Sequence, residues 1–415
     1  MSNDIQPEIR FPGFTEAWEQ RKLGEIAQKV SVGIATSSSE YFTDKETGVP
    51  FVKNQNVKEN WIDDSDLEFI THEFDEANRN KRLKTGDILT VRTGYPGLSA
   101  VVPSHLEGAQ TFTTLITRLK QETALPEYVS AFINSDAGMK QITGMEAGGA
   151  QKNVNAGILQ NLLIDLPSLA EQKAISDCTK LFDTTITLQQ CKLDLLKETK
   201  KGFLQKMFPK NGAKVPEIRF PGFTEDWEER KLGELGKTQS GIGFPDAEQG
   251  GSEGTPFFKV SDMNNIGNEY EMRNANHYVS NEQIERKKWK PIKDVPAIIF
   301  AKVGAAIMLN RKRLVTSPFL IDNNTMAYLF NNTWDIYFGK ILFETINLPR
   351  YSQVGALPSY NSSDIENISV KVPVKDEQQK IGTFFKQLDD TIALHQRKLD
   401  LLKETKKSFL QKMFV

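Results

Sequence analysis

Two stretches of the chain carry apolar side chains at steps of three, four or seven residues, the spacing of one stripe along an α-helix. The first stripe consists of Phe182, Ile186, Leu193, Leu196, Phe203 and Met207, and the second of Leu388, Ile392, Leu399, Leu402, Phe409 and Met413. Polar residues interrupt both stripes, Gln189 and Lys200 in the first and His395 and Lys406 in the second. Each stretch predicts a helix of about 38 residues and about 57 Å. Because either helix alone would expose its stripe, we expect the two to pair as a coiled coil. The alternative is that each is an ordinary amphipathic helix packed on its own globular core.

The residues before each stripe predict where the helices begin. Ser168-Leu-Ala-Glu171 follows Pro167 with the spacing of a capping box, and Asp376 follows Pro373 as a candidate cap. The preceding regions, about 27–166 and 236–372, mix short apolar runs with turn residues and predict a mixture of helices and strands. The predicted strands are 49–52, 88–92, 113–119, 298–302, 325–330 and 368–372, and the predicted helices are 127–142 and 334–348.

The chain is an internal duplication. Residues 7–26 recur at 216–235 with three differences in twenty positions, and residues 192–208 recur at 398–414 with one difference. The order is therefore a first domain at 1–166, a helix at 167–208, a linker at 209–215, a second domain at 216–372 and a second helix at 373–415. Because the duplication relates the two helices, we expect an antiparallel pair about an approximate two-fold axis, with the divergent domains at opposite ends of a rod.

Between the repeated blocks only scattered positions agree. Pro50-Phe51-x-Lys53 corresponds to Pro256-Phe257-x-Lys259, and the apolar run ending at Gly94 corresponds to the one ending at Gly304. Asn155, Asn161 and Pro167 correspond to Asn361, Asn367 and Pro373. The halves therefore share a fold and a surface for partners, whereas their remaining residues are suited to recognising different things.

Composition narrows the class of protein. The chain has 415 residues, a net charge of -2 and only two cysteines, Cys178 and Cys191, which do not form a Cys-x-x-Cys pair. Neither a membrane-spanning run nor a signal peptide is evident, so we expect a cytoplasmic protein without a membrane partner. Near-neutral charge does not exclude nucleic acid, because local basic patches decide such binding.

Catalytic motifs are missing from the sequence. A DNA adenine methyltransferase needs a glycine-rich cofactor turn and an Asn/Asp-Pro-Pro-aromatic loop, and this chain has no Pro-Pro. Gly241-x-Gly243 lacks a third glycine, and the run from Gly144 to Gly149 is not followed by Lys-Ser/Thr. The four histidines are scattered singly, so no metal site is expected. We therefore expect no catalytic residue, metal or cofactor in this chain.

The layout resembles the specificity subunit of type I restriction-modification systems, the HsdS family. The resemblance covers essentially the whole chain and rests on the tandem halves and the paired long helices. It also rests on Phe-x-x-x-Trp-x-x-x-x-Leu-Gly at 14–24 and 223–233, and on Pro-x-x-x-Glu-Gln at 167–172 and 373–378. It implies an α+β chain in which two tandem target recognition domains are separated by an antiparallel coiled coil with a pseudo-two-fold repeat.

The resemblance also implies a function. Each recognition domain would read one half of a split, asymmetric DNA site, and the helices would fix the spacer between the halves. The repeats would dock two HsdM methyltransferase subunits, which use S-adenosylmethionine to methylate adenine, and HsdR subunits would add an endonuclease that uses ATP and Mg²⁺. The alternative is a duplicated coiled-coil scaffold that binds two protein partners without reading DNA.

Cations that bind phosphates and amides that read adenine supply the candidate DNA contacts. In the first domain they are Lys53, Asn54, Asn56, Arg79, Lys81, Arg82, Arg92, Tyr95, Gln151 and Lys152. In the second they are Lys259, Asn264, Arg286, Lys287, Lys288, Lys302, Arg311, Lys312, Arg313 and Tyr360. The alternative for each is an ordinary solvated surface side chain.

Overall fold

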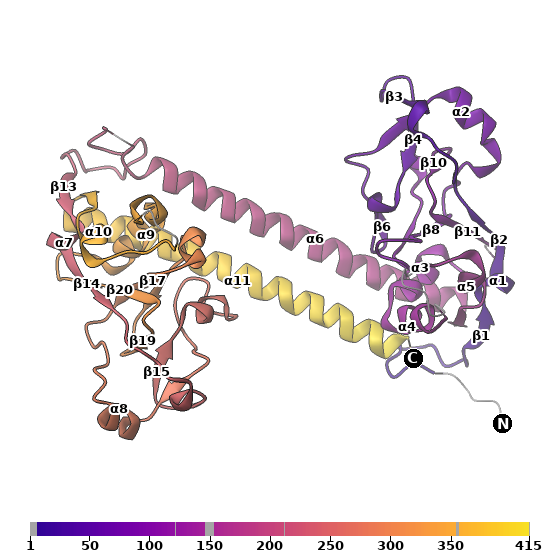
Figure 1. Ribbon diagram of the computed structural model, residues 1–415. Coiled ribbons are helices and arrows are strands. Elements are labelled where there is room, and N and C mark those ends of the chain that lie inside the picture. The colour runs from indigo at the N-terminus through magenta and orange to yellow at the C-terminus, as the bar shows by residue number, and fades with distance from the viewer. Residues whose placement is uncertain (1–5, 121, 146–152, 211, 354–356, 415) are drawn as a thin grey trace. The chain divides into compact units, whose positions relative to one another are not determined.

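The computed structural model describes residues 6–120, 122–145, 153–210, 212–353 and 357–414. The chain forms two compact units, one of residues 1–190 and 397–415 and one of residues 191–396. Two long helices, α6 (Leu169–Lys206) and α11 (Lys375–Met413), each begin in one unit and end in the other (Figure 1). The two helices and their lengths of 38 and 39 residues agree with the prediction. Each unit thus contains the end of the other half's long helix.

The first unit contains two four-stranded sheets. One has the order β2-β11-β8-β9 with antiparallel neighbours, and the other has the order β10-β4-β7-β3, in which β10 runs parallel to β4. Tyr128 and Phe132 pack with Ile88 and Leu115 in the buried core. The strands are β1 (Glu19–Lys22), β2 (Ala27–Val32), β3 (Phe42–Thr43), β4 (Val49–Val52), β5 (Val57–Lys58), β6 (Trp61–Ile62), β7 (Glu68–Ile70), β8 (Ile88–Thr90), β9 (Ser99–Val101), β10 (Gln110–Thr111), β11 (Leu115–Leu119) and β12 (Leu163–Leu166). The helices besides α6 are α1 (Leu23–Ile26), α2 (His72–Ala77), α3 (Pro126–Asn134), α4 (Asp136–Met145) and α5 (Ala156–Gln160).

The second unit repeats this plan. The order β14-β20-β17-β18 matches that of the first unit's first sheet, and β13 pairs with β21 as β1 pairs with β12. Its core includes Tyr328, Phe338 and Phe343. The strands are β13 (Glu228–Lys231), β14 (Gly236–Ser240), β15 (Thr255–Phe258), β16 (Tyr278–Val279), β17 (Ala297–Ala301), β18 (Lys312–Val315), β19 (Leu320–Ile321), β20 (Thr325–Phe330) and β21 (Ser369–Val372). The helices besides α11 are α7 (Leu232–Leu235), α8 (Asn281–Lys287), α9 (Ile336–Thr345) and α10 (Ser362–Glu366).

The predicted strands all coincide with observed strands to within a few residues, but the helix predicted at 127–142 is wrong as a single element. It is broken at Ser135, whose backbone is extended and whose hydroxyl donates to the Phe132 carbonyl at 2.6 Å. The Ser135 hydroxyl also accepts from the Gly138 amide at 3.2 Å, as a helix cap does. Gly138 lies so close to the Phe132 backbone that a larger side chain would collide with it. The amphipathic pattern continues through the break, which is why periodicity alone missed it.

The repeated blocks hold the start of each long helix to the rest of its unit. Arg10 donates from Nε and Nη2 to both carboxylate oxygens of Glu171 at 2.7 Å, and Arg219 does the same to Glu377 at 2.7 Å. Both glutamates are fully buried, and paired hydrogen bonds between a guanidinium and a carboxylate are strong. The predicted capping box is formed only in part: the Ser168 hydroxyl accepts from the Glu171 amide at 3.4 Å, whereas the Glu171 carboxylate binds Arg10 and not the start of the helix. Asp376 is not a cap, because it lies inside the first turn of α11.

Inside each unit the two long helices run antiparallel. In the second unit Phe203 packs edge-on against Phe384 at 5.0 Å, and Lys200 pairs with Asp389 at 2.8 Å. Residue numbers therefore rise along one helix in the direction in which they fall along the other. In the first unit the Phe182 and Phe409 rings lie 5.7 Å apart. Of the predicted stripe positions, Leu193, Met207, Ile392, Leu399 and Met413 are buried, and the remaining positions are partly buried.

The end of each long helix completes a hydrophobic core. Phe414, just after α11, packs edge-on against Tyr128 at 5.5 Å and Phe132 at 5.6 Å in the first unit. Phe208, just after α6, packs against Trp227 at 5.9 Å and Phe338 at 5.8 Å in the second unit. Among the described residues, no helix is long and apolar enough to cross a membrane.

Candidate nucleic-acid interface

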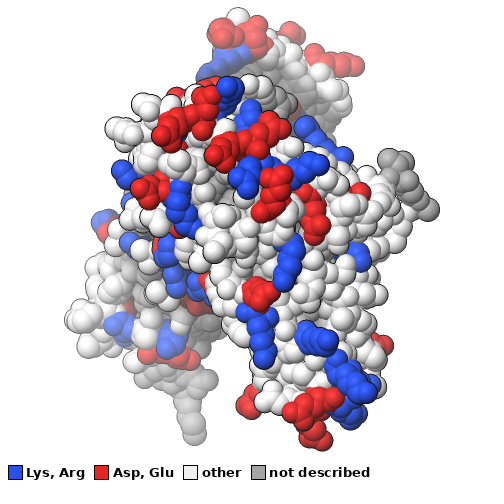
Figure 2. All heavy atoms as spheres, turned by 90° about the vertical axis from the view of Figure 1, so that its left-hand side faces the viewer, with Lys and Arg blue, Asp and Glu red and all other residues white. Residues whose placement is uncertain are grey.

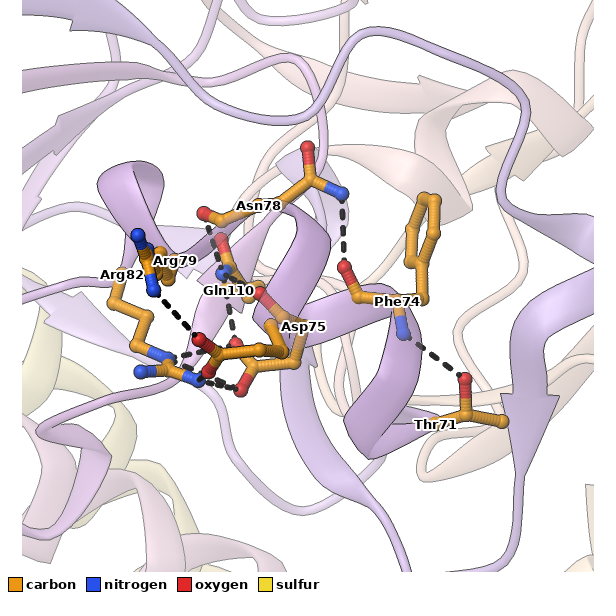
Figure 3. Close-up of polar contacts among 8 residues, drawn as sticks. Thr71, Phe74, Asp75, Asn78, Arg79, Arg82 and Gln110 are labelled. Carbon is orange, nitrogen blue, oxygen red and sulfur yellow. Dashed lines mark hydrogen bonds and ion pairs between the residues drawn. The ribbon is translucent and has the colours of Figure 1, made fainter.

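The basic cluster at 79–82 is largely neutralised by acidic side chains of α2. Arg82 donates from Nη2 to Asp75 at 2.6 Å and to Glu76 at 2.7 Å. Figure 3 shows the Arg82 guanidinium directed at the Asp75 carboxylate, which also accepts from Gln110 at 2.8 Å. Burial opposes ionisation of Asp75, but the hydrogen bonds from Arg82 and Gln110 outweigh it and lower the pKa of Asp75. Arg82 is therefore committed to holding its own domain together.

Other cations of the first unit are also engaged. Arg79 lies 3.2 Å from Glu76, although both side chains are exposed and such a pair is weak. Lys81 donates to a backbone carbonyl at 3.1 Å. Lys53 forms an ion pair with Glu68. Of these, only Arg79 remains readily available to a phosphate.

In the second unit, Glu248 forms ion pairs with two of the predicted cations. Lys287 lies 3.0 Å and Arg286 lies 2.8 Å from its carboxylate oxygens. The hydrogen bond from Lys287 leads the contributions that lower the pKa of Glu248. Lys288 ends α8 in the left-handed conformation at φ 53° and has no carboxylate partner within the part of the chain that the structure describes.

The cluster at 311–313 is only partly exposed. Arg311 donates to the Asn264 side chain, and Lys312 donates to the carbonyl of Ile346 at 2.5 Å. Burial lowers the pKa of Lys312 to about 8. Arg313 donates to the Lys312 carbonyl at 3.0 Å, and its pKa is lowered, chiefly by burial. Lys312 and Arg313 are thus cations held in a poorly solvated environment without a carboxylate paired to either of them among the described residues.

Two predicted contacts are corrected by their burial. Asn56 is 4% exposed, and its side chain accepts from the Lys53 amide and donates to the carbonyls of Asp63 and Asp66. Tyr360 is 3% exposed and packs against Phe300. Neither side chain can reach a base, because one stabilises a turn and the other belongs to the core. Lys259 donates to Gln249 at 3.3 Å, and Gln151 and Lys152 lie outside the described residues.

Arg92, Tyr95 and Lys302 are, like Lys288, predicted residues without a carboxylate partner among the described residues. Arg92 makes one long hydrogen bond of 3.4 Å to the Val154 carbonyl, and Lys302 donates to the Ser240 hydroxyl at 3.1 Å. Neither has a carboxylate partner among the described residues. Tyr95 is 81% exposed. All three lie in or beside the connection that follows the third strand of their sheets, β8 or β17.

Sequence reasoning missed two residues at the corresponding place in the second unit. Met308 and Leu309 are 64% and 58% exposed and lie in the connection between β17 and β18. The alignment of Gly94 with Gly304 was the available signal, because it placed Tyr95 and the residues after Gly304 in equivalent connections.

The face seen in Figure 2 carries basic and acidic side chains interspersed, without one broad basic field. That distribution agrees with the near-neutral net charge of -2. Among the residues that the structure describes, no three His, Cys, Asp or Glu side chains are placed to hold a metal ion.

A polar layer around the buried Lys406 ties the first unit's domain to its helices. Lys406 lies 2.6 Å from Asp183 and 2.5 Å from Glu59, whose loop follows β5. Asn60 donates to Asp183 at 3.3 Å and accepts from Asn134 at 2.7 Å. Burial opposes the charge of Lys406, but its two carboxylate partners outweigh burial and raise the pKa of Lys406. We call Lys406, Asp183 and Glu59 the first polar layer.

The second unit has an equivalent layer with different domain residues. Lys200 lies 2.8 Å from Asp389 and 2.6 Å from Glu344 of α9, and Lys340 pairs with the same two carboxylates. The Tyr270 ring lies within 5.1 Å of both ammonium groups. The lysine and the aspartate on the helices are related by the duplication, whereas the glutamates come from unrelated positions. The same helical pair therefore anchors two divergent domains.

The comparisons with known proteins identify the class to which this fold belongs. Residues 15–198 and 224–404 match the family described as the type I restriction modification DNA specificity domain, and the chain belongs to that family. It is a type I restriction-modification specificity subunit with two tandem recognition domains.

Particular relatives come from Methanocaldococcus jannaschii. The candidate type I restriction enzyme MjaX specificity subunit is 24% identical over 411 residues, which cover 95% of this chain and 92% of that protein. The type I restriction enzyme MjaVIII specificity subunit is 23% identical over 326 residues, 72% of each chain.

Solved structures agree at the level of the fold. A crystal structure of the S subunit of a type I restriction-modification system from M. genitalium gives a TM-score of 0.66 at 15% identity over 99% of each chain. A chain from a structural study of the assembly and conformational transition of the type I restriction-modification system gives 0.56 at 19% identity, over 98% of this chain and 99% of that chain.

Proposed function

We propose that this chain reads a split, asymmetric sequence of double-stranded DNA, one half-site per recognition domain, for a partner methyltransferase and endonuclease. The chain itself contributes no catalytic group. S-adenosylmethionine would be bound by the HsdM partner, and ATP and Mg²⁺ by the HsdR partner. Two different domains on one duplicated chain can read an asymmetric sequence, which two identical domains cannot do.

The observation that carries the proposal is a shared internal scaffold with divergent exposed residues. The buried pairs Arg10–Glu171 and Arg219–Glu377 have the same geometry in both units. By contrast, the exposed connection after Gly94 begins with Tyr95, and the one after Gly304 contains Met308 and Leu309. This is the division expected of two readers built on one plan, because phosphate-positioning parts can be shared while base-reading parts must differ.

The long helices offer the same surface twice, which favours two copies of one protein partner. Leu188 and Leu195 are exposed on α6, and their duplicated counterparts Leu394 and Leu401 are exposed on α11. Each pair is separated by seven residues, so its members share one face of a helix. An amphipathic segment of each methyltransferase subunit is the partner that such a row of leucines fits. The helices would also set the spacer between half-sites.

Methylome sequencing tests the proposal. A host expressing this chain with a partner methyltransferase is expected to carry adenine methylation at one split sequence. Exchange of residues 27–166 for the equivalent region of a relative should change one half-site and leave the other. An assembled complex that binds both protein partners and methylates no particular sequence would instead support the scaffold alternative.

A further inference from the structure

The connection after the third strand of the main sheet is built alike in both units. In the first unit it runs from β8 to β9 and in the second from β17 to β18, at the same place in the strand order. Each begins with a cation two residues before a glycine of positive φ, Arg92 before Gly94 at 90° and Lys302 before Gly304 at 88°. That conformation is accessible to glycine at little cost, so the chain turns outward at a fixed point. We call residues 93–98 the first tip and residues 304–310 the second tip.

The base of each tip is held by the same backbone contact. The carbonyl of Arg92 accepts from the amide of Val154 at 3.0 Å, and the carbonyl of Lys302 accepts from the amide of Tyr360 at 3.0 Å. Val154 and Tyr360 directly precede the asparagines that cap α5 and α10. Each tip therefore projects from a rigid base, which is what a precise contact with a ligand needs.

The exposed side chains on the tips are large and apolar, and they differ between the units. Tyr95 in the first tip is 81% exposed, and Met308 and Leu309 in the second are 64% and 58% exposed. A protein partner common to both halves would require the same residues in both tips. A ligand that differs between the halves while keeping a common backbone, as two DNA half-sites do, matches this pattern.

The surroundings of the tips carry the charges and amides that DNA requires. Arg92, Lys302 and Arg311 have no carboxylate partner among the described residues. The side-chain amide of Asn54 donates to the Thr93 hydroxyl of the first tip at 3.4 Å. The side-chain oxygen Oδ1 of Asn54 is buried without a hydrogen-bond partner among the described residues. Cations suit phosphates, and apolar side chains discriminate bases through the thymine methyl group or by entering a base step.

We infer that the two tips are the base-contacting elements, with Tyr95 reading the first half-site and Met308 and Leu309 the second, flanked by Arg92 and Lys302 on phosphates. This inference rests on the proposed DNA-reading function and names the residues that perform it. Loss of an apolar base contact is expected to weaken binding of the cognate duplex by roughly 5- to 100-fold.

The experiment compares Tyr95→Ala, the pair Met308→Ala/Leu309→Ala, and the control Trp61→Ala in the complete methyltransferase complex. Trp61 is another exposed aromatic residue of the first unit and lies off the tip, on β6. Methylome sequencing and titration with the cognate duplex are the measurements, and size-exclusion chromatography verifies assembly. Tyr95→Ala should relax or weaken one half-site only, the double variant should affect the other, and Trp61→Ala should change neither.

The flanking cations have a separate signature. Arg92→Gln and Lys302→Gln should weaken binding to all sequences alike and lower the slope of log affinity against log salt by about one each. If the wild-type complex reads a split site and Tyr95→Ala reads it with unchanged affinity, the inference fails and the proposed function stands. If Tyr95→Ala alters both half-sites, the inference also fails, because the tip would then act on assembly. If the wild-type complex binds no DNA, both the inference about the tips and the proposed function are refuted.

Discussion

The first polar layer predicts that Lys406→Met destabilises the chain far more than its position on a lysine-rich helix suggests. The substitution keeps most of the side-chain volume and removes the ammonium that lies 2.6 Å from Asp183 and 2.5 Å from Glu59. Two carboxylates then face each other without a counter-charge. At neutral pH both remain ionised in the unfolded chain, so the whole cost falls on the folded state.

The magnitude follows from how much water can reach each carboxylate. Removing one partner of a fully buried ion pair costs about 3–5 kcal/mol. Here Glu59 is 51% exposed and can turn to solvent, whereas Asp183 is 30% exposed and fixed on α6. A water-accessible cavity of about 530 Å³ borders the layer and lowers the cost further. We therefore expect a loss of about 2–3 kcal/mol in the free energy of unfolding.

Urea denaturation measures this loss, with Lys407→Met as the matched control. Lys407 is the next residue and is exposed, so its substitution should change stability by no more than about 0.5 kcal/mol. Adding Asp183→Asn to Lys406→Met removes the uncompensated, partly buried charge and should recover at least about 1 kcal/mol. If Lys406→Met costs no more than Lys407→Met, or if Asp183→Asn recovers nothing, the layer does not hold the domain to its helices.

Three further predictions concern packing, protonation and spacing. Gly241→Ala would push its Cβ into a backbone carbonyl and should cost about 1–3 kcal/mol in thermal denaturation, whereas Gly243→Ala faces open space and should be neutral; equal effects would contradict the packing argument. Lys312 has a pKa lowered to about 8, against about 10.4 when unfolded, so the unfolded chain holds a proton that the folded chain releases between these values. The free energy of unfolding should therefore rise with pH across that window relative to Lys312→Met, and parallel pH profiles in urea titrations would show that the lysine is solvated. Insertion of four residues near Thr199 adds about 6 Å of helix and turns the apolar stripe by only about 40°, so the methylated site should keep its half-sites and gain spacer length; an active variant with an unchanged spacer would refute the spacing role.

The sequence predicted the elements whose pattern is local. Apolar periodicity located α6 and α11, because burial of one helix face dictates that pattern. Short apolar runs located β4 and β20, and β20 is buried at five of its six positions. The duplication then predicted the shared plan of the two units without any knowledge of tertiary contacts.

The availability of the candidate DNA contacts could not be predicted, because it depends on tertiary partners. In sequence Arg82 and Arg286 have the appearance of ordinary surface cations. The fold places Arg82 against Asp75, and it places Arg286 against Glu248, which is 38 residues away. Glu171 has the spacing of a capping residue, yet a partner 161 residues away decides its role. Tyr95 could be predicted as a candidate because it is aromatic, whereas Met308 could not, because an exposed apolar residue looks the same in sequence as a core residue.

The interleaving of the two units has a consequence for synthesis. The core around Tyr128 and Phe132 receives Phe414 only after residues 191–396 have been made. At 5–20 residues per second that interval is on the order of 10–40 s. Translation of the first unit therefore begins before that of the second unit and is completed after it. Until Phe414 has been synthesised, the apolar surface of Tyr128 and Phe132 that Phe414 covers stays uncovered. Phe208, by contrast, is synthesised before the second domain against which it packs. A substitution at Phe414 should therefore destabilise the recognition domain that is translated first.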